Sequence, residues 1–81
     1  MTRAELVAEL ATWIGQITED APPELDDDTD LVADLGLDSL ALAELAAKLR
    51  MKHKIKLRPT ELASDLRVGP IVELVLARLG P

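Results

Sequence analysis

The helical spacing of the apolar residues is the feature that most limits what this chain can fold into. Within residues 3–18, apolar side chains recur every three or four positions, as on one face of an amphipathic helix. These side chains are Leu6, Leu10, Trp13, Ile14 and Ile17. Thr2 and Glu5 stand at the start of this stretch in the arrangement of a capping box. The pattern therefore predicts a first helix over residues 3–18.

Two later stretches show the same periodicity. The first is predicted to begin at Asp38 or Ser39, and basic residues near its end complement the negative end of the helix dipole. Its inward side chains are expected to be Leu42, Leu45, Ala46 and Leu49. The second is predicted to have Gly69 as its N-cap and Pro70 as its first helical residue, and to end at Gly80–Pro81. Its inward side chains are expected to be Ile71, Leu74, Val75 and Leu79.

The segments between these helices differ in length and character. Residues 19–37 contain many acids and two prolines, which predicts a long loop with a short turn at residues 31–35. Four apolar side chains are expected to pin this loop to the core: Leu25, Leu31, Val32 and Leu35. Pro59 and Thr60 favour the start of one short helix, which is expected to run through Leu66.

Together these segments predict an all-α fold. We expect an antiparallel four-helix bundle with three longer helices, one short third helix, and a long acidic loop between helices 1 and 2. The chain has 81 residues, which predicts a single domain over residues 1–81 and leaves little room for an internal catalytic cavity. The sequence has no cysteine, and its one aromatic residue is Trp13. The core is therefore predicted to be aliphatic, with Trp13 packed against it, and a reactive thiol would have to come from a cofactor.

The charge is divided unevenly along the chain. Residues 1–46 contain twelve acids and one base, a net charge of −11, whereas residues 47–81 contain eight bases and three acids, a net charge of +5. Such an acidic half repels nucleic acid and suits basic partner proteins, although simple solvation is the alternative. The sequence lacks the pattern of a signal peptide and an apolar run long enough to cross a bilayer. We expect a cytoplasmic protein that binds neither nucleic acid nor membrane.

Ser39 is the strongest candidate for a functional residue. It lies at the predicted start of the second helix, where backbone N–H groups lack helical partners and the helix dipole is positive. A phosphate ester on the Ser39 hydroxyl would be stabilised by these groups. The alternative is that Asp38 and Ser39 simply cap the helix, as the same residue types do in many helical proteins.

The segment Leu35-Gly36-Leu37-Asp38-Ser39-Leu40 resembles the attachment signature of the acyl and peptidyl carrier proteins, and the resemblance extends over most of the chain. It implies a 4′-phosphopantetheine arm on Ser39, with Asp38 assisting recognition. It also implies that Leu37, Leu40 and Glu44 contact partner enzymes. These partners would be a phosphopantetheinyl transferase, and acyl- or aminoacyl-loading and condensing enzymes with basic docking patches. We expect a monomer that catalyses no reaction itself.

The residues around Ser39 also bear on the pathway. The motif that they form is similar to that of polyketide-type carriers. The second helix is basic in its later half, where carriers of fatty acid synthesis tend to be acidic. We therefore expect a discrete acyl carrier protein that shuttles thioester-bound intermediates in polyketide-type or related specialised metabolism. The alternatives are a carrier of fatty acid synthesis, an aminoacyl or peptidyl carrier, an excised module of a larger protein, and a small acidic helical adaptor.

Other functional patterns in the sequence are incomplete. Asp26, Asp28 and Asp30 occupy the first, third and fifth positions of a calcium-binding loop, but its sixth position is not glycine and its twelfth is not glutamate. The one histidine, His53, would lie roughly 20 Å from Ser39 along the helix, too far to act as its base. We expect His53 to be a solvent-facing residue at the helix C-terminus, and we predict neither a metal site nor a catalytic site.

Overall fold

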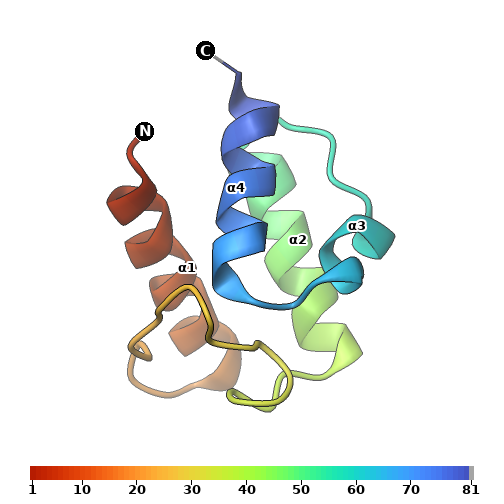
Figure 1. Ribbon diagram of the computed structural model, residues 1–81. Coiled ribbons are helices and arrows are strands. Elements are labelled where there is room, and N and C mark those ends of the chain that lie inside the picture. Colours follow the sequence, from red (N-terminus) through yellow and green to blue (C-terminus); the bar gives the residue numbers. More distant parts are fainter. Residues whose placement is uncertain (81) are drawn as a thin grey trace.

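The computed structural model describes residues 1–80, which form a bundle of four helices without a β-strand (Figure 1). The helices are α1 (Arg3–Thr18), α2 (Ser39–His53), α3 (Pro59–Ser64) and α4 (Val68–Leu79). Three of them are long, the third is short, and a long loop separates α1 from α2. The predicted all-α architecture is therefore confirmed.

The connections between the helices set their directions. Figure 1 shows α1 running toward the end of the bundle that the long loop covers, and α2 running back from it. The segment after α2 and helix α3 then return the chain along the outside of the bundle to the same end. Consequently α1 is antiparallel to both α2 and α4, whereas α2 and α4 run in the same direction. The start of α1 and the end of α4 lie at the same end of the bundle.

The core is aliphatic, as predicted, and it contains no polar or charged residue in the part of the chain that the structure describes. Every helix and both long connections contribute to it. Its members are Leu6, Leu10, Ile14, Leu31, Leu37, Leu45, Ala46, Leu49, Leu57, Leu62, Val68, Ile71, Val72 and Val75. Trp13 is half-buried and packs against this cluster, as expected. In α4 the predicted inward residues Leu74 and Leu79 are only half-buried, because Val68 and Val72 take the central positions.

Helix α1 begins at the residue that the sequence predicts, because its capping box forms. The Thr2 hydroxyl accepts a hydrogen bond from the Glu5 N–H, and the Glu5 carboxylate accepts one from the Thr2 N–H, both at 3.1 Å. Two backbone donors that have no partner within the helix are thereby satisfied. The helix ends at Thr18, since Glu19 adopts the left-handed conformation with φ 57°.

Backbone hydrogen bonds tie the long loop to the connection between α3 and α4. The Leu31 N–H donates to the Leu66 carbonyl at 3.0 Å. The Val68 N–H donates to the Thr29 carbonyl at 2.9 Å. These bonds have the form of an antiparallel bridge, and they join segments that lie more than thirty residues apart in the sequence. The loop is therefore part of the folded body of the protein.

This pairing explains why α3 and α4 have other bounds than the sequence predicts. Helix α3 ends at Ser64 and does not reach Leu66, because the backbone of Asp65 is extended (φ −150°, ψ 115°) and carries the chain into the pairing with the loop. Helix α4 begins at Val68, two residues before the predicted Pro70. The predicted N-cap Gly69 lies inside its first turn. Both predictions were wrong at the boundary where a distant segment pairs with the chain.

The apolar residues of the loop hold it to the core, with one exception. Leu31 is buried, and Leu25 and Leu35 are half-buried, as predicted. Val32 was predicted to point inward, but it is 42% exposed. The predicted turn is present, because the Asp30 carboxylate accepts a hydrogen bond from the Val32 N–H at 2.8 Å. The turn directs Val32 outward while Leu31 points into the core.

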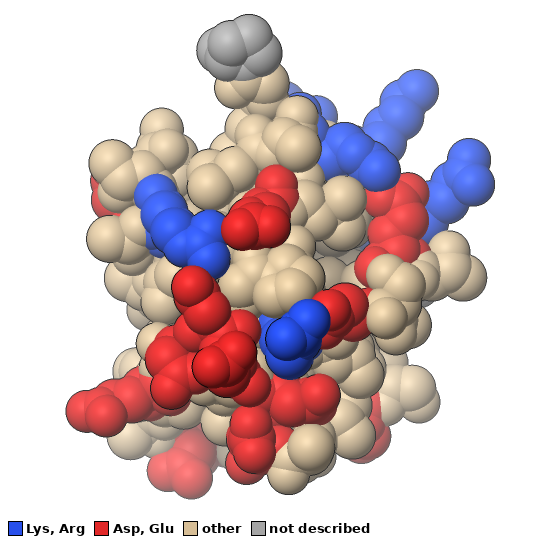
Figure 2. Space-filling model, in the orientation of Figure 1, with Lys and Arg blue, Asp and Glu red and all other residues tan. Residues whose placement is uncertain are grey.

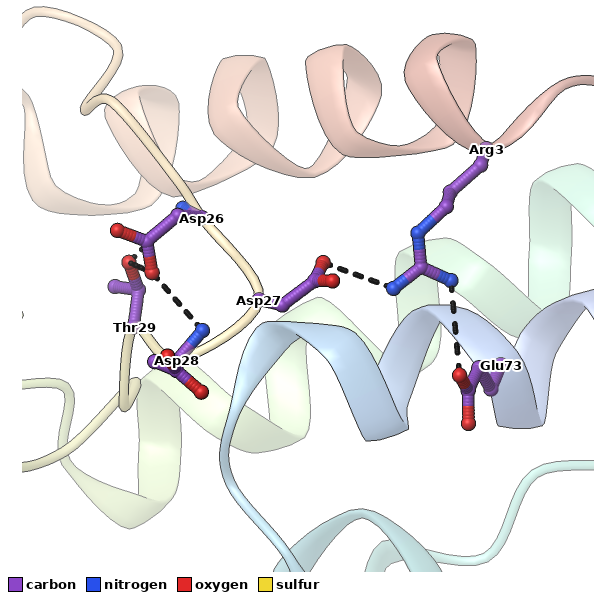
Figure 3. Close-up of polar contacts among 6 residues, drawn as sticks. All are labelled: Arg3, Asp26, Asp27, Asp28, Thr29 and Glu73. Atoms are coloured by element: carbon purple, nitrogen blue, oxygen red, sulfur yellow. Dashed lines mark hydrogen bonds and ion pairs between the residues drawn. The ribbon is translucent and has the colours of Figure 1, made fainter.

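Arg3 joins the loop to two helices, as Figure 3 shows. Its guanidinium group, on α1, lies 2.8 Å from the Asp27 carboxylate of the loop and 4.0 Å from the Glu73 carboxylate of α4. Beside it, the Asp26 carboxylate accepts a hydrogen bond from the Asp28 N–H at 2.9 Å. Acids of the incomplete calcium pattern therefore serve to fold the loop.

His53 does not face solvent, so that prediction was wrong. Its side chain is 9% exposed, and its Nε2 lies 2.5 Å from Oε1 of Glu9, whose side chain is 10% exposed. Lys52 pairs with the other oxygen of Glu9, and the Trp13 ring stands edge-on to the imidazole at a centroid distance of 6.2 Å. The antiparallel arrangement of α1 and α2 brings these side chains together, which the spacing along one helix does not reveal.

We predict that the Glu9 cluster makes stability depend on acid pH. Burial raises the pKa of Glu9, but hydrogen bonds from Lys52 and His53 outweigh it and hold the pKa below its ordinary value of 4.5. Because the folded state has the lower pKa, the contribution is complete above pH 4.5 and is lost as the pH falls through the folded-state pKa. Glu9→Gln should lower the free energy of unfolding by about 1–3 kcal/mol at neutral pH, as measured by urea denaturation. A difference from wild type that persists undiminished in strong acid would contradict this account.

We also predict that Gly69 cannot be replaced without loss of stability. Its N–H donates to the Asp27 carbonyl at 3.0 Å, and a Cβ at this position would lie 3.1 Å from the Asp27 Cβ and 3.2 Å from that carbonyl oxygen. Gly69→Ala should therefore lower the free energy of unfolding by about 1–3 kcal/mol, because the added methyl group pushes the loop away. Alanine is the better helix former by about 1 kcal/mol, so an unchanged or increased unfolding free energy would show that the close approach is unimportant.

Candidate functional site

Ser39 is the first residue of α2 and lies where the long loop ends. The preceding residue, Asp38, has an extended backbone, and its Oδ1 accepts a hydrogen bond from the Ala41 N–H at 2.8 Å. Asp38 is therefore the N-cap, and the predicted start of this helix is confirmed. Because Asp38 makes the capping bond, the Ser39 hydroxyl is not needed for it.

The backbone before Ser39 turns from the core to the surface within a few residues. Gly36 has φ 71°, a left-handed conformation that glycine adopts readily. Leu37 is 3% exposed, and its N–H donates to the Leu31 carbonyl at 3.0 Å. Ser39 is exposed, and Leu40 after it is 68% exposed. The chain therefore passes from the buried Leu37 to the exposed Ser39 within three residues.

The three predicted partner contacts do not share one environment. Leu37 belongs to the core, so its side chain holds the end of the loop beneath Ser39 and is not available to a partner. Leu40 and Glu44 are exposed and lie one helical turn apart. Together with Asp38 they line a hollow of about 270 Å³ beside the end of α1. The structure thus brings Asp38, Leu40 and Glu44 together around one hollow. Leu37 also lines this hollow, but it does so from the core, since it is only 3% exposed.

The surroundings of the Ser39 oxygen suit a phosphate ester. The first turn of α2 presents backbone N–H groups and the positive end of a 15-residue helix, and it contains no acidic residue. The neighbouring Asp38 carboxylate is engaged by the Ala41 N–H, and solvent screens its charge because the residue is exposed. The residues present therefore fit a phosphodiester carried on Ser39.

A narrow groove opens beside Ser39 between α2 and α3. Leu42 and Ala43 of α2 form one wall, Leu62 and Ala63 of α3 form the other, and Ser39 lies at its edge. The groove has a volume of about 150 Å³. Leu42 was predicted to point into the core, but it is half-buried and lines this groove. The side chains of Ala43 and Ala63 are small, and this leaves the space between the two helices open.

The acidic and the basic side chains also lie on different parts of the surface. Figure 2 shows acidic side chains gathered over the end of the bundle that the loop covers, and Lys and Arg side chains projecting near the other end. Arg67 is a base close to the acidic side, and its guanidinium group makes two hydrogen bonds to Asp65, at 2.8 and 3.1 Å. Hydrogen bonds from the Arg67 side chain and backbone lower the pKa of Asp65 to about 2.

Other kinds of site find little support in the described residues. His53 ends α2, at the opposite end from Ser39, and is engaged with Glu9. Within residues 1–80 no group of three or more His, Asp or Glu side chains is arranged to hold a metal ion. None of the described helices has both the length and the apolar character that crossing a membrane requires.

Unfolding experiments can test whether Asp38, and not Ser39, caps α2. We predict that Asp38→Ala lowers the free energy of unfolding by about 1 kcal/mol, because the cap of α2 is lost. Ser39→Ala is its matched control and should stay within about 0.5 kcal/mol of wild type, as an exposed residue without a capping role. Equal losses for the two variants, measured by urea denaturation, would show that Ser39 is a structural cap.

Sequence comparisons connect this chain with carrier proteins. The family model described as the phosphopantetheine attachment site matches residues 4–75. An acyl carrier protein of Rhodococcus erythropolis is 34% identical over 74 residues, which cover 91% of this chain and 81% of that protein. A meromycolate extension acyl carrier protein of Mycolicibacterium smegmatis is 32% identical over 74 residues, covering 91% of this chain and 75% of that protein.

A solved structure has the same fold. It is the solution structure of the apo doublet acyl carrier protein from prodigiosin biosynthesis, with a TM-score of 0.71 and 26% sequence identity. The match covers 94% of this chain but 37% of that chain, so this chain spans little more than a third of the doublet protein.

Proposed function

Because the chain belongs to the phosphopantetheine-binding family of acyl carrier proteins, we propose that Oγ of Ser39 is the atom to which its 4′-phosphopantetheine arm is joined. Members of this family tether acyl intermediates and are not enzymes, and the same holds for this chain. The observation that carries the proposal is the position of Ser39. It is exposed at the start of α2 while its neighbour Asp38 makes the capping bond.

The residues around Ser39 have distinct tasks in this proposal. Leu37 fixes the loop from below, so the serine is presented at a defined place on the surface. The N-terminus of α2 stabilises the negative phosphodiester. The arm supplies a terminal thiol that forms a thioester with the acyl group, which this cysteine-free chain cannot do with its own side chains. The protein itself holds, presents and releases the cargo.

Members of this family work with a phosphopantetheinyl transferase and with biosynthetic enzymes. We propose that Leu40 and Glu44 form the contact that these enzymes share, with Leu40 as its apolar centre and Glu44 facing a basic docking patch. Exposed ion pairs contribute little individually, so such contacts would be brief and sensitive to salt. Brief contacts suit a monomer that visits several active sites in turn.

We propose an acyl chain as the cargo, in polyketide-type or related specialised metabolism. The hydrocarbon walls of the groove beside Ser39 suit an acyl chain better than a charged aminoacyl group. The names of the relatives support a carrier in lipid or specialised metabolism: two of those compared are named for meromycolate extension and prodigiosin biosynthesis. The motif around Ser39, with a basic later half of α2, favours the specialised pathway over fatty acid synthesis.

The attachment site is tested by intact-protein mass spectrometry. The wild-type protein, incubated with coenzyme A and a phosphopantetheinyl transferase, should gain the mass of one phosphopantetheinyl group, and Ser39→Ala should gain none. Ser64→Ala is the matched control, because Ser64 is the other serine of the chain and is also exposed. It should be loaded like the wild type. Loading of the Ser39→Ala variant would refute the site.

A further inference from the structure

Helix α3 lies between two hollows. On one side is the groove beside Ser39, which α3 lines with Leu62 and Ala63. On the other side is a hollow of about 310 Å³ between α3 and α4, which α3 lines with Glu61 and Ser64. Few side chains therefore fill the space on either flank of this six-residue helix. Its position depends on a small number of contacts.

Two side chains of α3 make the contacts that bear most directly on its position. On its inner side Leu62 is 2% exposed and packs in the core. On its outer side Arg78 of α4 reaches across the larger hollow, where one guanidinium nitrogen pairs with the Glu61 carboxylate and another donates to the Lys56 carbonyl at 2.6 Å. We call Arg78, Glu61 and the Lys56 carbonyl the Arg78 clamp. The N-cap residue of α3, Arg58, makes no side-chain capping bond that would add a further fixed point.

The size of the groove limits what it can hold while the clamp is closed. An aliphatic cavity of about 150 Å³ is large enough for a molecule of about six carbons, such as benzene. The wall on the side of α2 cannot give way, because Leu45, Ala46 and Leu49 behind it are completely buried and close-packed. The wall formed by α3 has the empty hollow behind it. A longer chain therefore gains room only if α3 moves toward α4.

We propose that Arg78 and Glu61 determine the length of the acyl chain that the groove beside Ser39 admits. With the clamp closed, the groove takes about six carbons and the rest of a longer chain stays in solvent. With the clamp open, α3 moves into the hollow next to α4, and the widened groove encloses more carbons of the acyl chain. This inference rests on the proposed attachment at Ser39, since the arm must start at the edge of the groove.

The test uses the full chain loaded with acyl groups of about four to about twelve carbons, transferred together with the arm from the acyl-coenzyme A by a phosphopantetheinyl transferase. Each methylene that enters the groove should raise the midpoint of thermal unfolding by about 3 °C. In wild type the rise should stop near about six carbons. In Arg78→Gln and in Glu61→Gln it should continue to longer chains. NMR shifts of the Leu62 and Ala63 amides report whether the chain lies in the groove.

A matched control removes an arginine ion pair that does not touch α3. Arg3→Gln loses the contacts with Asp27 and Glu73, and it should keep the chain-length limit of the wild type. The inference would be overturned if both clamp variants kept the chain-length limit of the wild type. It would also be overturned if acylation left the NMR shifts of the Leu62 and Ala63 amides unchanged. Failure of the proposed function is a separate outcome, because the mass spectrum would then show no loading of Ser39 before any melting curve is recorded.

Discussion

The structure depends on the backbone pairing between the long loop and the connection that joins α3 to α4. The loop carries most of the acids of the chain, and their mutual repulsion opposes a compact arrangement. Hydrogen bonds from Leu31 to Leu66 and from Val68 to Thr29 hold it nevertheless, and Arg3 neutralises part of its charge at Asp27. Without this pairing neither the start of α4 nor the approach to α2 would have a fixed position.

The site follows from that constraint. Once the loop is fixed at Leu31, its last residues have one way to join α2: Leu37 enters the core, Asp38 caps the helix, and Ser39 is left on the surface. Three adjacent residues thus have three different tasks, although all three belong to one short motif. The neighbouring residues fix the backbone at Ser39, and its hydroxyl takes no part in capping the helix. A side chain in this position is suited to modification, because its modification does not disturb the fold.

The sequence predicts best what local interactions decide. The capping box at Thr2 and Glu5 sets the start of α1, and the Asp38 cap sets the start of α2, because both signals act within one helical turn. Predictions failed where a distant segment takes part. The start of α4 depends on pairing with the loop, and the burial of His53 depends on its contact with Glu9 of α1. Leu37 is buried by contacts with residues outside the motif.

The two sides of α2 differ in packing: one side is buried in the core, and the other lines the groove beside Ser39. On its inner side this helix buries Leu45, Ala46 and Leu49 completely, and a small chain depends heavily on such a core. Toward α3 it packs against the buried Leu62, but the small alanines leave a groove between the two helices. Opening this core to admit a guest would separate close-packed side chains and would cost a small bundle much of its stability. Helix α3 has a hollow on each flank, so it is the element that can shift while the packed core stays unchanged.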